Sequence, residues 1–343
     1  MSVNKKLTVS ASPHVRSPHT VSGIMLDVII ALIPSLIAAV VIFGYRVLMV
    51  TLVCVGSAVL AEYLSRKVMK RHQTISDLSA VVTGLLLAFN LPVSIPLWIA
   101  ALGSIIAIVV VKQMFGGIGQ NFVNPALAAR IILLMSFPSA MANWATDSKF
   151  ITTTATPLAN ISVPSDTEVM TSFVGEAKEL PSLLDMFLGL HGGCFGEVCS
   201  LTLIIGGIYL VVRKVISPAI PLAYIGTVAV FMLIAGKGDF EFVAYQLLGG
   251  GLLLGAIFMA TDYTTCPVSF KGKIIFGIGC GVITTVIRLF GSLPEGVSFS
   301  IILMNLLVPH IERLTTAKPF GTPKKDKKAE KAAKKAEKEA AKA

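Results

Sequence analysis

The sequence predicts an all-α integral membrane protein with about ten transmembrane helices in two inverted five-helix repeats, N-in and C-in. Three observations lead to this prediction. Hydrophobic residues make up 54% and charged residues 14% of the 343 positions, whereas a soluble domain averages about a quarter charged residues. Apolar runs of roughly membrane-spanning length recur along the chain. Basic residues gather in alternate connections between these runs.

A helix needs about 20 apolar residues to cross the hydrocarbon core. The segments that meet or approach this length are 23–43, 46–64, 77–93, 96–114, 122–141, 199–212, 217–236, 245–262, 272–291 and 297–312. The resulting organisation is a cytoplasmic N-terminal segment (1–22), a first membrane repeat (23–141), an extracytoplasmic segment (142–198), a second membrane repeat (199–315) and a basic cytoplasmic tail (316–343).

The distribution of charge predicts the orientation. Cytoplasmic connections carry an excess of Lys and Arg, which fits the 66–71 cluster, Arg213 with Lys214, and the lysine-rich tail. The segment 142–198 is acidic and is expected outside. No small-residue cleavage site precedes the first apolar run, so the first helix is expected to act as the insertion signal. The tail is read as a solvated arm or as a contact for anionic lipid headgroups; no aromatic interleaving suggests nucleic acid.

Two stretches resemble each other and suggest a duplicated unit. Gly249–Ser269 reads GGGLLLGAIFMATDYTTCPVS, and Gly84–Ser94 reads GLLLAFNLPVS. Gly251 and Gly255 are four residues apart, which predicts a helix face on which another backbone packs closely. Each stretch lies in the third span of a five-span half, so homologous halves would have opposite orientations and a binding site between them near the midplane. Chance similarity of apolar sequence is the alternative.

Charged residues within the predicted spans are the first candidates for function, since burying them in lipid is costly. Four that fall in or at the ends of spans are Asp27, Arg130, Asp262 and Arg288. Either they form structural ion pairs and helix-end contacts, or they line an ion or cofactor path. The five cysteines are an odd number and argue against a disulfide framework. Of these, only Cys194 and Cys199 could pair.

The connection Lys112–Pro125 contains a glycine loop that opens a new helix. Asn124 is expected to cap this helix, with Pro125 in its first turn. The loop is either a tight connection or a site where backbone amides around Gly117 and Gly119 meet an anionic group.

Several motifs occur together in a fixed order: Ser12-Pro13-His14, DLSAVVTG at 77–84, GGIGQNFVNPA at 116–126, ATPLA at 155–159, GGCFGE at 192–197 and FMATD at 258–262. In these residues the chain resembles the D subunit of the Rnf ion-translocating electron transport complex. That family is related to the B subunit of the sodium-pumping NADH:quinone reductase. The resemblance runs to about residue 315.

The resemblance implies a flavoprotein. Family members carry FMN on a threonine through a phosphoester bond made by a flavin transferase, and the matching position here is Thr156, preceded by Thr153, Thr154 and Ala155. Thr154 departs from the family, which has glycine at that position. A second, non-covalent flavin, riboflavin, is expected in the membrane part. Asp262 and the polar ends of the third and eighth spans are candidates for that pocket or for an ion path, and Asn124, Gly117 and Gly119 are further candidate cofactor contacts.

The implied activity is electron relay within a complex of the inner cell membrane. Electrons pass between ferredoxin and NAD, coupled to Na⁺ or H⁺ translocation, with the NAD and ferredoxin sites on other subunits. The competing prediction is an inverted-repeat transporter or channel for a small solute with no redox role. A purely structural anchor for partner subunits is a third alternative.

Overall fold

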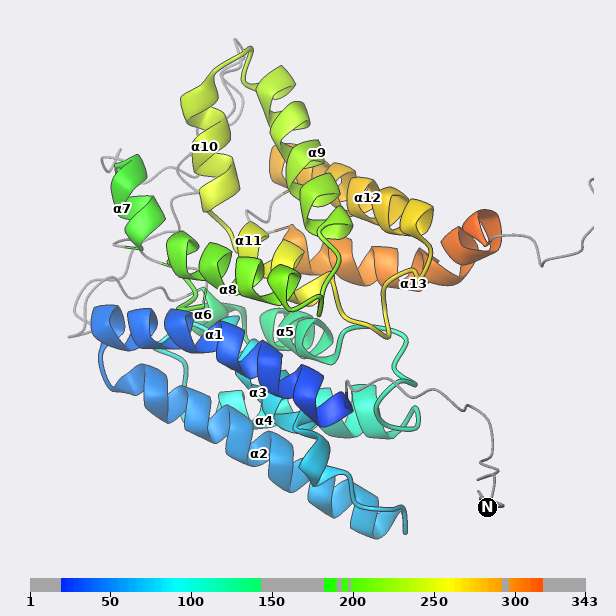
Figure 1. The fold of residues 1–343 in the computed structure, drawn as a ribbon. Helices are drawn as coiled ribbons and strands as arrows, with labels where there is room; N and C mark the ends of the chain where they lie inside the picture. Colours follow the sequence, from blue (N-terminus) through cyan, green and yellow to red (C-terminus); the bar gives the residue numbers. More distant parts are fainter. Residues whose placement is uncertain (1–19, 143–181, 190–192, 197–198, 292–295, 317–343) are drawn as a thin grey trace, which may run out of the picture.

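The computed structural model describes residues 20–142, 182–189, 193–196, 199–291 and 296–316, and within them every regular element is a helix (Figure 1). The first half contains α1 (Val21–Phe43), α2 (Arg46–Val68), the short η1 (Ile75–Asp77), α3 (Ser79–Phe89), α4 (Leu97–Ile105), the π-helix η2 (Ile106–Gln113), α5 (Pro125–Ser136) and α6 (Pro138–Met141). The second contains α7 (Leu183–Leu188), α8 (Ser200–Val212), α9 (Ala219–Ala235), α10 (Phe240–Leu248), α11 (Leu252–Leu254), the π-helix η5 (Gly255–Met259), α12 (Phe270–Phe290) and α13 (Val297–Thr315).

The lengths and apolar composition of the helices fit a multi-pass membrane protein. Among the described residues, α1, α2, α12 and α13 are long and apolar enough to cross a bilayer. The pair α10 and α11–η5 adds a fifth span if it is counted as one helix bent by 63°. Five shorter apolar helices are α3, α4–η2, α5, α8 and α9. Each predicted span contains at least one helix, so the all-helical prediction is confirmed for the described residues; ten crossings and their orientation stay predictions.

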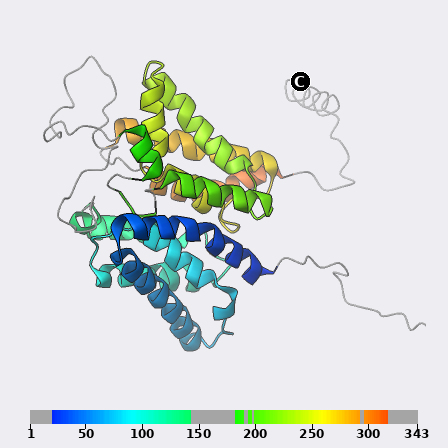
Figure 2. The same ribbon diagram turned by 60° about the vertical axis from the view of Figure 1, so that its left-hand side comes forward.

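The two halves form two groups of helices that meet along α1 and α8 (Figures 1 and 2). These helices run antiparallel, since Tyr209 donates to Asp27 at 2.9 Å while Ser35 donates to Thr202 at 3.1 Å. A Cβ at Gly206 would collide with the carbonyl oxygen of Ala31. The two backbones therefore touch, as in other small-residue helix interfaces in membranes.

The short helix α3 explains why the predicted span 77–93 is not a full helix. α3 packs on α2 at Gly84, whose added Cβ would lie 2.9 Å from the carbonyl oxygen of Cys54. It ends at Phe89, and the buried residues that follow are not helical. Arg46 satisfies the carbonyls of this segment, donating to Val93 at 2.9 Å, Ser94 at 3.3 Å and Ile95 at 3.2 Å. Irregular backbone can lie at membrane depth when such protein partners exist.

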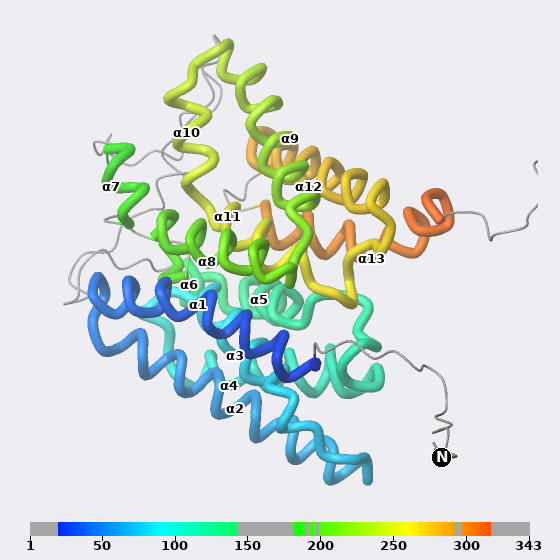
Figure 3. The backbone as a smooth tube through the Cα atoms, viewed as in Figure 1, coloured from blue at the N-terminus to red at the C-terminus, as the bar shows by residue number. Residues whose placement is uncertain are grey.

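The stretch Gly249–Ser269 differs from its prediction. Its glycines do not form one helix face, because Gly251 has φ +66° and precedes a helix that starts only at Leu252. Gly255 faces the side chain of Val297 in α13 rather than another backbone. The chain bends sharply between α10 and α11 (Figure 3). Arg288 of α12 occupies this break and donates to the carbonyls of Gly249 at 3.1 Å and Gly250 at 3.3 Å.

All five cysteines are free thiols, in agreement with the prediction that they form no disulfide framework. Cys194 and Cys199 are both free thiols. Cys194 instead donates to the carbonyl of Asn90 at 3.3 Å, and the neighbouring Phe195 packs edge-on against Phe89 with ring centroids 5.7 Å apart. The turn at 193–196 is thereby docked on the end of α3. Thr153, Ala155 and Thr156, and most of the segment 142–198 that contains them, lie outside the described residues.

Candidate functional site

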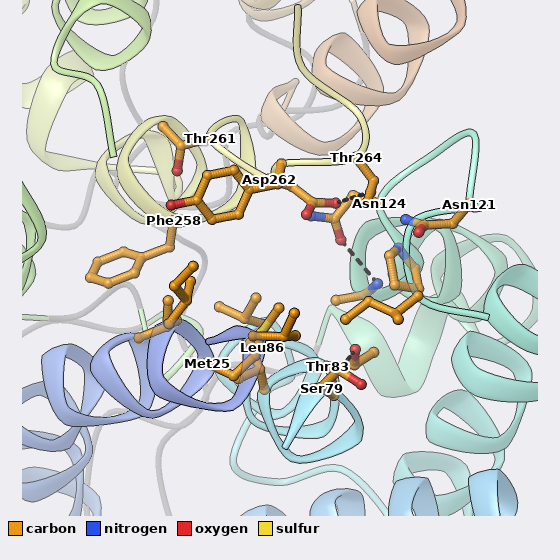
Figure 4. A pocket seen from close by; sticks show the side chains of 18 of the residues that line it. Met25, Ser79, Thr83, Leu86, Asn121, Asn124, Phe258, Thr261, Asp262 and Thr264 are labelled. Atoms are coloured by element: carbon orange, nitrogen blue, oxygen red, sulfur yellow. Dashed lines mark hydrogen bonds between the residues drawn. The ribbon is translucent and has the colours of Figure 1, made fainter. Parts of the chain in front are cut away.

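A cavity of about 460 Å³ lies between the two halves (Figure 4). Its walls come from α1, α3, the end of η2, the glycine loop with the start of α5, the end of α8 and the residues that follow it, and η5 with the segment after it. Met25, Thr83 and Leu86 form one wall, and Phe258, Thr261 and Asp262 form the wall that faces it. This volume is typical of small-molecule and cofactor sites.

The lining divides into an apolar part and a polar part. The apolar part includes Ile24, Met25, Val28, Val82, Leu86, Leu210 and Phe258. The polar part includes Ser79, Thr83, Lys112, Asn121, Asn124, Thr261, Asp262 and Thr264. A planar ligand with one apolar edge and one hydrogen-bonding edge matches such a lining.

Asn124 joins the two halves at the cavity. Its Oδ1 accepts from the amides of Ala126 at 3.1 Å and Leu127 at 3.3 Å, which confirms the predicted N-cap with Pro125 in the first turn. Its Nδ2 donates to the carbonyl of Met259 at 3.2 Å, at the end of η5. Because Met259 follows the cavity residue Phe258, this side chain holds the wall of the second half against α5.

Asn121 and Asp262 keep hydrogen-bonding atoms available to a ligand. Asn121 donates from Nδ2 to the carbonyl of Val123 at 3.1 Å, and its Oδ1 accepts no hydrogen bond from the described residues. Asp262 accepts at Oδ2 from Thr264 at 3.1 Å and Thr265 at 3.2 Å. The backbone amides of Tyr263 and Thr264 also donate to this carboxylate. These oxygens can accept from an imide or hydroxyl group in the cavity.

The other predicted contacts divide between the cavity and its surroundings. Gly119, with φ +85°, lines the cavity. Gly117 does not; its amide donates to the carbonyl of Lys112 at 2.9 Å, and a Cβ there would collide with the guanidinium of Arg66. Cys266 follows the cavity residue Asp262 by four positions. Burial raises the pKa of the Cys266 thiol to about 11, so this thiol is protonated and a poor nucleophile at neutral pH.

The remaining charges predicted within spans have protein partners. Asp27 pairs with Arg213 at 3.3 Å across the two halves. Arg130 donates to Asn90 at 3.1 Å and Ser298 at 2.8 Å, linking α3, α5 and α13. Arg288 closes the helix break described above. Of the four charges singled out from the sequence, Asp262 alone lines the cavity.

Sequence reasoning missed the buried pair formed by Glu62 and Lys112, whose Nζ lies 3.1 Å from Oε2 of Glu62. It also missed Ser79, Thr83 and Asn121 as cavity residues. A signal for the pair was present, because two opposite charges fell inside the predicted spans 46–64 and 96–114. Lys112 was instead assigned to a cytoplasmic connection.

Comparison with known proteins gives a consistent result over nearly the whole chain. Residues 8–321 match the model of the NQR2, RnfD, RnfE family. The D subunit of the Na⁺-translocating ferredoxin:NAD⁺ oxidoreductase complex of Acetobacterium woodii is 48% identical over 94% of this chain and 98% of its own length. The D subunit of the proton-translocating complex of Clostridium ljungdahlii is 41% identical over 92% and 96%. The D subunit of the ion-translocating oxidoreductase complex of Escherichia coli K12 is 31% identical over 91% and 98%.

Proposed function

Because the chain belongs to the NQR2, RnfD, RnfE family, we propose that it is the D subunit of an Rnf-type ferredoxin:NAD oxidoreductase complex in the inner cell membrane. In this proposal it relays electrons through bound flavin, coupled to translocation of Na⁺ or H⁺. The likeness to D subunits over nearly the full length is the observation that carries the assignment. The relatives include both a sodium- and a proton-translocating complex, so both ions remain in the proposal. The ferredoxin and NAD sites belong to other subunits.

The first proposed flavin is FMN joined by a phosphoester to Thr156. Support comes from the resemblance of residues 153–159 to the attachment motif of the family, with Thr153 and Ala155 as its neighbours. A flavin transferase would install it. The flavin supplies one- and two-electron chemistry, and the protein fixes its position and potential.

The second proposed flavin is riboflavin in the cavity between the halves. The apolar lining suits the dimethylbenzene edge of the ring, and Asn121 and Asp262 suit the polar edge. Among the lining residues that the structure describes, Lys112 is the only basic one. Its three ammonium donors are used by the two oxygens of Glu62 and by Ser79. Because the Asp262 carboxylate also lines the cavity, a flavin without phosphate fits better than FMN.

We further propose ten spans in two inverted repeats, with both termini in the cytoplasm. The antiparallel course of α1 and α8, the first helices of the two membrane halves, supports opposite orientations. The start of α1 and the end of α13 lie on the same side of the molecule in both views (Figures 1 and 2). Alkaline phosphatase inserted within 142–198 should be active, and a fusion after the tail inactive. An active fusion at the tail would contradict the orientation.

A flavin inventory of the purified complex tests the function. The denatured D subunit is expected to fluoresce in a gel, and its tryptic peptide to carry the mass of FMN. The supernatant after denaturation is expected to contain riboflavin without phosphate. Fluorescence absent from both fractions, after co-expression with the transferase, would overturn the flavin relay and favour a transporter with no redox role.

A further inference from the structure

We propose that the ammonium group of Lys112, fixed by Glu62 and Ser79, sets the reduction potential of the flavin in the cavity. This inference rests on the proposed function, since it concerns the riboflavin that we propose for this cavity. It assigns an electrostatic role to a lysine that would otherwise count as one half of a structural ion pair.

The Lys112 side chain is buried and tightly held. It is 3% exposed, and its Nζ donates to Oε2 of Glu62 at 3.1 Å, Oε1 of Glu62 at 3.2 Å and Oγ of Ser79 at 2.6 Å. Ser79 in turn donates to Asp77 from both its amide and its hydroxyl. The position of the positive charge is therefore fixed by groups on α2, η1, η2 and α3.

The π-helix η2 brings Lys112 to the inside of the protein. Buried residues on α4 and η2 come in adjacent pairs that recur every four residues, and the first members of these pairs are Ile99, Gly103, Ala107 and Val111. Lys112 is the second member of the last pair. In an α-helix a four-residue step overshoots a full turn by about 40°. The wider π turn counteracts this drift, so the buried face continues to the end of the element. Such π segments are frequent at functional sites.

The ion pair is oriented with its positive end toward the cavity. Lys112 and Ser79 line the cavity, whereas Glu62 does not. Glu62 is fully buried behind them and also accepts from Gln113 at 2.9 Å and Thr74 at 3.0 Å, with Nε of Arg66 3.8 Å away. A molecule in the cavity is therefore closer to the cation than to the anion. The acidic group that does line the cavity, Asp262, belongs to the facing wall.

This arrangement acts on charge that appears during reduction. Two electrons and one proton added to an isoalloxazine ring leave one negative charge on it. In the complex the electrons come from its redox partners, and in a titration they come from dithionite. A fixed cation in a low-dielectric surrounding stabilises that charge and raises the potential of the flavin, as charges near flavin nitrogens do.

Two single variants distinguish this role from a structural one because they predict opposite signs. Lys112→Gln should lower the midpoint potential of the non-covalent flavin, and Glu62→Gln should raise it. Each shift is expected to reach at least a tenfold change in the relative affinity for reduced and oxidised flavin, about 30 mV for a two-electron couple. Lys112→Arg, which keeps the charge, should stay near the wild-type potential. The covalent FMN of the same preparation is the internal reference.

Each single variant leaves one buried charge without its partner, which is strongly destabilising. The double variant Glu62→Gln with Lys112→Gln restores a neutral pair and should lower the potential by less than Lys112→Gln alone. An unchanged potential in the double variant with riboflavin bound, or shifts of the same sign in both single variants, would overturn the role of Lys112. Absence of riboflavin from the wild-type complex would instead overturn the cavity assignment itself.

Discussion

Replacing Thr156 with alanine is expected to remove the covalent flavin from the protein completely. Alanine has no hydroxyl oxygen, so the phosphoester cannot form at this position. In-gel fluorescence of the denatured protein should fall to background, and the FMN mass increment should disappear from the peptide. Ferredoxin-dependent NAD reduction by the assembled complex should fall at least tenfold, because one carrier of the relay is lost.

The neighbouring threonines provide matched controls for this variant. Thr153→Ala removes a hydroxyl from the same stretch and should keep the covalent flavin. Thr154→Gly introduces the glycine found in the family and relieves the conformational restriction of a β-branched residue, so flavin incorporation should be equal to or higher than wild type. Full fluorescence in Thr156→Ala, or its loss in Thr153→Ala alone, would move the attachment to a different residue.

Filling the cavity from α3 is expected to abolish binding of the non-covalent flavin. Thr83 points into the cavity (Figure 4), and its hydroxyl donates only to the carbonyl of Ser79 within the same helix, at 2.9 Å. A tryptophan at this position would occupy space required by the isoalloxazine ring. Riboflavin released from purified Thr83→Trp complex should decrease at least tenfold relative to covalent FMN, which serves as the measure of correctly assembled protein.

A tryptophan on the outer surface controls for the bulk of the substitution. Ile37 of α1 is 58% exposed and does not line the cavity, so Ile37→Trp should retain wild-type riboflavin. If Thr83→Trp also retains it while covalent FMN is present, the flavin binds elsewhere. If both variants lose riboflavin equally, the effect comes from added bulk and the cavity assignment fails.

The sequence predicted those features that depend on local chemistry. Apolar run length located the helices, and Asn124 before Pro125 predicted a helix cap that the structure contains. Asp262 was singled out because a carboxylate near lipid is costly, and it does line the cavity. These properties depend on a residue and its immediate neighbours.

Features that depend on distant partners were not predictable in the same way. The Gly251 position was read as part of a smooth helix face because nothing local shows that Arg288 stabilises a break there. The inward direction of Lys112 depends on a π turn, for which no simple residue pattern exists. The pairing of Glu62 with Lys112 required knowing that α2 and η2 are neighbours. Hydrophobic periodicity reports which residues are buried, not which buried polar groups meet.

Arg46 and Arg288 each donate to the carbonyls of an irregular segment, but Arg46 comes before its segment in the sequence and Arg288 comes after it. Arg46 precedes its acceptor Val93 by 47 residues, so this donor already exists when that segment leaves the ribosome. Arg288 follows its acceptor Gly250 by 38 residues. The carbonyls at the α10–α11 break are therefore expected to gain their Arg288 donor only once α12 has been synthesised. Carbonyls without a donor are excluded from the hydrocarbon region. The donor to the Val93 carbonyl, by contrast, precedes that carbonyl in the chain.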